Sequence, residues 1–330
     1  MVIPVCLFVV GLLCLIKGGD WFVDGAVGIA HRFHIPELLI GATVVSIGTT
    51  LPEVMVSTTS ALGGHGEIAY GNAIGSVICN AALIAAITIA AKPGKVDARA
   101  LRTPVGFFFA AAAIYAITAY STGYFSRPIG LLLLAMFAVY MAVTVVQVKR
   151  LPGQSKGLPD HDGPPPDGGG EGEPSTVRDL VLLAVGAALI AVGANLLVDN
   201  GILIAQALGV PESVIALTFV ALGTSLPELV TAVTSLLKGH GSLSLGNVVG
   251  ANLFNLVLVS GVSVALAPFR IPQSAVILGH NASLVLELPV MFLVMVVLTG
   301  PALLRGKLTR AQGILLLAIY AGFCAVQFML

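Results

Sequence analysis

The chain has 330 residues, of which 57% are hydrophobic and only 10% are charged, and its net charge is zero. Soluble domains carry about a quarter charged residues, so this composition excludes an ordinary soluble protein and indicates a polytopic helical membrane protein. No segment has the basic composition of a nucleic-acid-binding domain. The four cysteines stand apart in apolar stretches, without the spacing of a metal site or a disulfide framework.

Ten apolar segments are long enough to cross a bilayer, which takes about 20 residues in a helix. We expect an all-α membrane protein, and we interpret the first apolar run as a span because it lacks the basic start and cleavage pattern of a signal peptide. The predicted spans are residues 2–29, 36–62, 67–91, 103–120, 127–148, 177–199, 211–237, 242–266, 274–299 and 310–329.

A polar stretch divides the ten spans into two sets of five. Residues 151–176 contain six prolines and five acidic residues, a composition that cannot bury a core and predicts a disordered linker. The expected organisation is a five-helix unit at 1–150, this linker, and a second five-helix unit at 177–330.

The positions of lysine and arginine predict the orientation in the membrane. With the N-terminus outside, thirteen of these residues fall in inner loops, and only Arg127 and Arg270 fall in outer loops. Because positive residues concentrate on the cytoplasmic side, we expect both termini to be extracytoplasmic, the linker to be cytoplasmic and the membrane to be a prokaryotic plasma membrane.

The two halves are related by one constant offset. Since each half has five spans, the second half enters the membrane upside down, and such inverted repeats are typical of secondary transporters with a site at the midplane. A shift of 175 residues superimposes Pro36 on Pro211, Thr49 on Thr224, Pro52 on Pro227, Glu53 on Glu228, Gly71 on Gly246, Asn72 on Asn247, Gly75 on Gly250 and Asn80 on Asn255.

Each half carries a proline motif within a span, Gly-Thr-Thr-Leu-Pro-Glu ending at Glu53 and Gly-Thr-Ser-Leu-Pro-Glu ending at Glu228. Proline removes an N–H and displaces the carbonyl four residues back, which frees hard oxygen donors suited to Na⁺ or Ca²⁺. An ionised carboxylate within the membrane is costly and indicates a functional site. We therefore expect the two glutamates to meet at one cation site.

The span after each motif adds further polar residues. Ser76 and Asn80 are four residues apart and share a helix face, and Ala251 and Asn255 occupy the equivalent positions in the second half. The nearby glycines permit close helix packing.

These paired segments resemble the two alpha-repeats of the sodium/calcium exchanger family, within the calcium/cation antiporter superfamily, and the short linker resembles that of prokaryotic members. The resemblance implies a non-enzymatic Na⁺/Ca²⁺ antiporter that works by alternating access, with Na⁺ and Ca²⁺ as substrates and no cofactor or obligate protein partner. By position, it implies that the cation site is formed by Glu53, Glu228, Thr49, Thr224, Thr50, Ser225, Ser46, Ala221, Ser76, Asn80, Asn255 and Ala251.

Two positions depart from the family pattern. Ala251 stands where some members have serine, and Asn255 stands where some members have aspartate. The first change removes one expected Na⁺ ligand, and the second removes a titratable group, so the stoichiometry stays open. A Ca²⁺/H⁺ antiporter on the same fold is the main alternative, because protons could replace Na⁺ on the glutamates. A channel or an intramembrane enzyme fits the motifs less well.

Several polar residues lie outside these motifs. Asp24 and Asp199 share the 175-residue offset, and they either gate ion access or mark helix ends in the headgroup region, with Lys17 and Asp20 paired nearby. Glu287 has no counterpart in the first half, and His240 is expected to be solvated in a loop.

Overall fold

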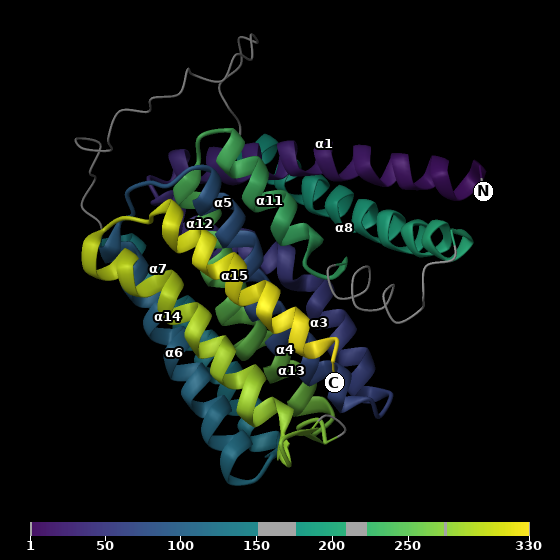
Figure 1. Cartoon of the computed structure of the whole chain (residues 1–330). Coiled ribbons are helices and arrows are strands. Elements are labelled where there is room, and N and C mark those ends of the chain that lie inside the picture. The colour runs from purple at the N-terminus through teal and green to yellow at the C-terminus, as the bar shows by residue number, and fades with distance from the viewer. Residues whose placement is uncertain (1, 151–175, 209–222, 274–275, 330) are drawn as a thin grey trace, which may run out of the picture.

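The computed structural model describes residues 2–150, 176–208, 223–273 and 276–329. The predicted linker at 151–176 lies outside this range except for its last residue, as do the first part of the seventh predicted span and Ala221. The described chain is almost entirely helical, and Figure 1 shows the helices gathered into one bundle with α1 and α8 side by side along one edge.

The first half contains five helical spans, of which two are interrupted by π-helical turns. One span runs through α2, η1 and α3, and the next through α4, η2 and α5. The elements are α1 (Val2–Arg32), α2 (Glu37–Ile40), η1 (Gly41–Val45), α3 (Ser46–Leu62), α4 (Gly66–Cys79), η2 (Asn80–Ile84), α5 (Ala85–Ala91), α6 (Ala98–Ser121), β1 (Tyr124–Phe125) and α7 (Arg127–Arg150).

The second half repeats this order with the seventh span described only from its later part. Its elements are α8 (Thr176–Ala207), α11 (Leu226–Leu237), α12 (Gly241–Phe254), η4 (Asn255–Val259), α13 (Ser260–Leu266), β2 (Phe269–Arg270), β3 (Val276–Ile277), β4 (His280–Asn281), η5 (Ser283–Glu287), α14 (Leu288–Arg305) and α15 (Arg310–Gln327). Strand β1 pairs with β2 in antiparallel fashion and joins the two halves at one end of the bundle.

Nine helical segments within the described ranges are long and apolar enough to cross a membrane, and α11 supplies the end of a tenth. The prediction for the ninth span was wrong at its start, because the helical segment begins at Ser283 and not at residue 274. Strands β3 and β4 instead form a hairpin. Its two turn residues, Leu278 and Gly279, have φ values of 48° and 82°, as a tight two-residue hairpin requires.

Helices α1 and α8 pack against each other through glycines along most of their length. A Cβ atom on Gly18 would lie 2.9 Å from the backbone nitrogen of Ile190, and one on Gly186 would lie 2.5 Å from that of Phe22. Because only hydrogen fits at these positions, the two backbones approach closely. Arg32 at the end of α1 also pairs with Asp179 in the first turn of α8, at 3.2 Å, so the pair is joined by charge as well as by packing.

The centre of the bundle is formed by α4–α5 and α12–α13, the two most buried spans. Each contains a π-helical segment, and η2 and η4 start at Asn80 and Asn255. The two starting positions differ by the same 175 residues that relate the two halves. A π-helical turn widens the backbone and often occurs at functional sites, so the same irregularity marks the same position in both halves.

Candidate functional site

The two proline motifs lie in different local structures in the two halves. Pro52 lies inside the continuous helix α3, whereas Pro227 lies at the start of α11, directly after a turn at Thr224 and Ser225. The expected break at the proline motif is therefore present in the second half. In the first half the irregular turn is instead η1, which directly precedes α3.

Glu53 and Glu228 are both completely buried, with no exposed surface. Their side chains come from α3 and α11, in opposite halves of the chain, and these two helices pack against each other. The structure therefore places the two acids that the repeat pattern singled out on adjacent helices. No lysine or arginine within the described ranges forms an ion pair with either carboxylate.

Hydroxyl groups of the first motif reach the acid of the second half. Thr50 Oγ1 lies 3.5 Å from Glu228 Oε1. Thr49 Oγ1 lies 3.3 Å from Asn247 Oδ1, and Ser46 Oγ donates to the Asn247 backbone carbonyl at 3.0 Å. Polar residues of the first half thus contact polar residues of the second half at this site.

Many buried oxygens around the two acids accept no hydrogen bond within the described part of the chain. Both carboxylate oxygens of Glu53 and one of Glu228 belong to this group, as do the amide oxygens of Asn80 and Asn255 and the hydroxyl of Ser225. A buried polar group without a partner is costly. A cluster of such oxygens around two acids is the environment that a hard cation requires.

The two asparagines lie on elements that contact the opposite half. Segment η2, which begins at Asn80, packs against α11, and η4, which begins at Asn255, packs against α3. Ser76 lies buried one turn before Asn80, and Ala251 holds the equivalent buried position before Asn255. Each asparagine therefore sits on a helix that adjoins the glutamate-bearing helix of the other half.

Of the other predicted site residues, Ser225 is buried and Thr224 is half-buried in the turn before α11. Asn247 belongs to a repeated motif but was not predicted as a site residue, although it accepts hydrogen bonds from the Ser46 and Thr49 hydroxyls. Its repeat partner Asn72 donates to the backbone carbonyl of Glu53 at 3.3 Å and to Ser57 Oγ at 2.8 Å. Their shared offset was the signal that could have identified them.

A small cavity of about 10 Å³ lies between the α1–α8 pair and the proline motifs, and its lining includes Phe22, Thr49 and Pro227. That volume is room for about one water-sized particle. Groups of three or more His, Cys, Asp and Glu residues that could hold a metal are absent among the described residues. Any cation here would depend on two carboxylates and on neutral oxygens.

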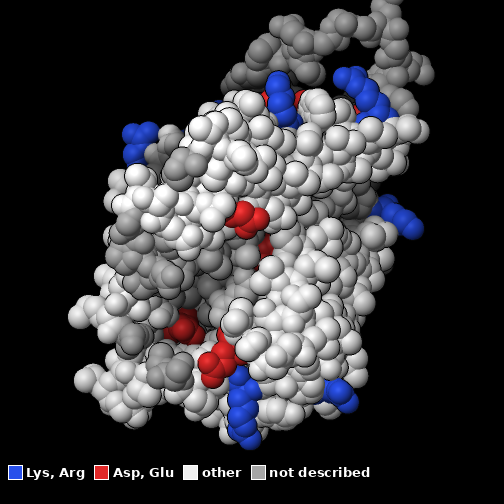
Figure 2. All heavy atoms as spheres, turned by 90° about the vertical axis from the view of Figure 1, so that its right-hand side faces the viewer, with Lys and Arg blue, Asp and Glu red and all other residues white. Residues whose placement is uncertain are grey.

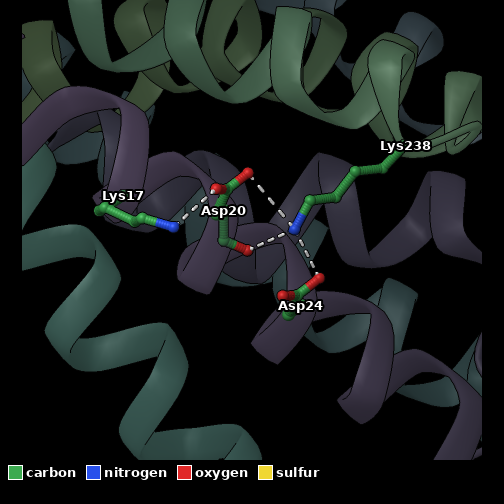
Figure 3. Close-up of polar contacts among 4 residues, drawn as sticks. All are labelled: Lys17, Asp20, Asp24 and Lys238. Carbon is green, nitrogen blue, oxygen red and sulfur yellow. Dashed lines mark hydrogen bonds and ion pairs between the residues drawn. The ribbon is translucent and has the colours of Figure 1, made fainter. Parts of the chain in front are cut away.

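A charged cluster joins α1 to the end of α11, outside the buried site. Lys238 Nζ lies 2.8 Å from Asp24 Oδ1 and 3.5 Å from Asp20 Oδ1, and Figure 3 shows the ammonium group pointing between the two carboxylates. Lys17 lies 4.0 Å from Asp20, which confirms the predicted pairing. Asp24 is therefore held in an ion pair in this conformation.

The structure revises the prediction for His240 and gives Glu287 a partner. His240 is not simply solvated, because its Nδ1 lies 2.9 Å from Glu37 Oε1 and both side chains are largely buried. Glu287, at the end of η5, accepts a hydrogen bond from Gln327 at 3.1 Å. Figure 2 shows several acidic side chains in and around a hollow, while lysines and arginines stand mainly at the margin of that face.

Comparison with known proteins agrees with this architecture. The family model described as sodium/calcium exchanger protein matches residues 3–146 and 179–329. The putative antiporter CaxA of Alkalimonas amylolytica is 32% identical, with 98% of each chain covered. The sodium/calcium exchanger MaX1 of Methanosarcina acetivorans is 29% identical, covering 98% of this chain and 97% of its own length.

The fold also matches a solved structure. The sodium-calcium exchanger NCX_Mj, in a crystal soaked with Na⁺ and Sr²⁺, superimposes with a TM-score of 0.81 at 32% identity, covering 98% of both chains. The all-helical inverted-repeat arrangement is therefore shared over 98% of this chain. The chain belongs to the sodium/calcium exchanger family and is an integral membrane cation antiporter.

Proposed function

We propose that this antiporter exchanges Na⁺ for Ca²⁺ across a prokaryotic plasma membrane, at a site centred on Glu53 and Glu228. The observation that carries the proposal is the pair of buried carboxylates from opposite halves, surrounded by oxygens that accept no hydrogen bond within the described ranges. Two negative charges match one Ca²⁺, and with neutral oxygens they also suit Na⁺.

The remaining ligands are assigned by position around these acids. Hydroxyl, amide and backbone oxygens complete a coordination shell, since Ca²⁺ takes about six to eight oxygen ligands. Thr50 contacts Glu228, and the neighbouring Thr49 contacts Asn247. Besides these two threonines and the two acids, the proposed set is Ser46, Ser76, Asn80, Ala221, Thr224, Ser225, Ala251 and Asn255, in which Ala221 and Ala251 offer only backbone carbonyls.

Exchange follows from competition for the same carboxylates. A site between two inverted halves opens to one side at a time, so Na⁺ bound from one side replaces Ca²⁺ released to that side. If three Na⁺ move for each Ca²⁺, one net charge crosses per cycle, and the membrane potential contributes about 2.3 kcal/mol per 100 mV to the movement of that charge.

The proposed arrangement of the chain in the membrane has five-helix units at 1–150 and 177–330, a cytoplasmic linker at 151–176, and both termini outside.

Coupling to protons is the alternative, and it rests on the complete burial of the two carboxyl groups, which could carry protons in place of Na⁺. The two possibilities separate in proteoliposomes that are loaded with Na⁺, K⁺ or a pH gradient while the membrane potential is clamped. Ca²⁺ uptake driven by Na⁺ alone supports the proposal. Uptake driven by the pH gradient alone would assign the proton-coupled function.

The site is tested by Glu53→Gln and Glu228→Gln, each of which removes one charge and keeps the side-chain shape. We expect each variant to lose Na⁺-driven Ca²⁺ uptake. Glu287→Gln is the matched control, because Glu287 is also an acid in a membrane span but pairs with Gln327 and is not one of the proposed ligands. Full uptake by either site variant would refute the assignment of these glutamates.

A further inference from the structure

A second cavity lies at the end of the bundle that carries most lysines and arginines. It encloses about 230 Å³ between the α5–α6 loop, the start of α12, α2 and the α14–α15 turn. Its inner wall is apolar and includes Leu38, Leu245 and Leu308. This cavity shares no lining residue with the small cavity beside the proline motifs.

The charge of the cavity is positive. Lys92 and Lys95 line it, and its lining contains no acidic residue. Neither lysine forms an ion pair with a described residue. Arg310 binds the carbonyl groups at the end of α5, donating to Ala90 O at 2.9 Å. Two ammonium groups would repel a transported cation, so the cavity suits an anion and not the ion pathway.

The N-terminus of α12 opens onto the same cavity through Gly241 and Ser242. The first N–H groups of a helix have no partner inside it and carry partial positive charge. The side chain of the preceding residue, His240, makes no capping hydrogen bond and instead contacts Glu37. The first turn of α12 also contains no acidic residue, so this helix end has no negative group of its own nearby in sequence.

The repeat-related helix differs in that respect. Helix α4 carries Glu67 in its first turn, and the 175-residue offset places Ser242 at the equivalent position of α12. An acid at a helix N-terminus is favourable because it complements the helix dipole. The first half thus carries an acid in the first turn of this helix, whereas the second half carries none in its first turn, and Glu37 contacts the preceding His240 instead.

A buried hydroxyl is a separate indication that a ligand binds in this cavity. Ser244 is 2% exposed and lines the cavity, yet its Oγ has no hydrogen-bond partner within the described part of the chain. A buried polar atom without a partner is costly unless something binds it. The hydroxyl can donate to an anion that also meets the α12 amides.

We propose that this cavity binds a phosphate group, held by Lys92, Lys95, Ser244 and the first amides of α12. Helix N-termini are favourable sites for phosphate, and a phosphate offers enough oxygens to meet donors from both sides of the cavity. The apolar wall favours the phosphate of an anionic lipid, because basic pockets at the membrane surface bind such headgroups. Free inorganic phosphate carries the same chemistry. This proposal does not depend on which ions the protein exchanges.

The experiment measures the melting temperature of the full chain in nanodiscs of phosphatidylcholine alone, with phosphatidylglycerol added, or with inorganic phosphate added at constant ionic strength. A ligand that binds the folded state stabilises it, so we expect a rise of about 2 °C or more in the wild type. The double variant Lys92→Gln/Lys95→Gln should lose that rise. Lys149→Gln, an exposed lysine that does not line the cavity, should keep it.

A second variant tests the helix end without removing the lysines. Ser242→Glu places an acid where Glu67 stands in the first half, so it should raise the melting temperature in phosphatidylcholine and reduce the response to added phosphate groups. A rise with phosphatidylglycerol only assigns the site to lipid, and a rise with inorganic phosphate assigns it to the soluble ion. No rise with either, or an equal rise in the double variant, would overturn the proposal.

Discussion

Thr50 Oγ1 of the first half lies 3.5 Å from Glu228 Oε1 of the second half. A hydroxyl of one proline motif therefore contacts the acid of the other motif. Loss of a typical hydrogen bond costs about 0.5–1.5 kcal/mol, or about two- to tenfold in affinity. We therefore predict that Thr50→Val raises the half-saturating Ca²⁺ concentration by about two- to tenfold, measured as Ca²⁺ uptake into proteoliposomes.

The control for that variant lies on the same helix. Thr59 donates to the backbone carbonyl of Met55 at 2.8 Å and is exposed, so Thr59→Val should leave the Ca²⁺ dependence unchanged. An equal loss in both variants would mean that valine harms the helix in general and that the contact with Glu228 has no special role.

Ala251 gives a prediction of the opposite sign. It is fully buried one turn before Asn255, at a position where a serine would offer one more oxygen. If the proposed site is correct, Ala251→Ser should lower the Na⁺ concentration that half-saturates exchange. Ala69→Ser, a buried change near the start of α4, should leave that value unchanged. A Na⁺ dependence identical to that of the wild type would remove position 251 from the site.

Much of the fold was accessible from sequence, because the information lay in strong patterns. Apolar runs located the spans, and the offset that aligns Glu53 with Glu228 identified the inverted halves. Both acids were predicted to meet at one site, and the structure buries both of them on helices that pack against each other, α3 and α11. The start of the ninth span was predicted wrongly because the hairpin at residues 276–281 is apolar enough to resemble a helix end.

The local geometry of the site was less accessible. The π-helical turns starting at Asn80 and Asn255 leave no mark in hydropathy, since they change the backbone and not the residue pattern. The acceptor role of Asn247 depends on how α12 packs against η1 and α3, and this contact spans about two hundred positions of the chain. Sequence patterns show which residues share a face of a helix, but they do not show which residues of the two halves come into contact.

The glycine packing between α1 and α8 leads to a stability prediction. A Cβ atom at position 186 would lie 2.5 Å from the Phe22 backbone nitrogen and 2.7 Å from its Cα. Since backbone atoms cannot move aside easily, Gly186→Ala should force the helices apart at a cost of about 1–3 kcal/mol. We expect a melting temperature several degrees below that of the wild type in detergent.

Gly322→Ala provides the comparison, because a Cβ there meets nothing within 4 Å. Alanine favours a helix over glycine by about 0.5–1 kcal/mol, so this variant should melt at the wild-type temperature or slightly above it. If Gly186→Ala were equally stable, the close approach of the two helices could not be essential to the fold.

The last prediction concerns the cluster in Figure 3, where Lys238 Nζ lies 2.8 Å from Asp24 Oδ1 and 3.0 Å from the Asp20 backbone carbonyl. An isolated exposed ion pair is worth about 0–1 kcal/mol, but this ammonium contacts three oxygens and its side chain is only 27% exposed. Lys238→Met should therefore lower the melting temperature more than Lys17→Met, whose side chain is 68% exposed. The difference should shrink at high salt, because screening weakens charge pairs. Asp24→Asn combined with Lys238→Met should cost less than the sum of the single changes; strictly additive losses would show that the two side chains do not stabilise the fold as a pair.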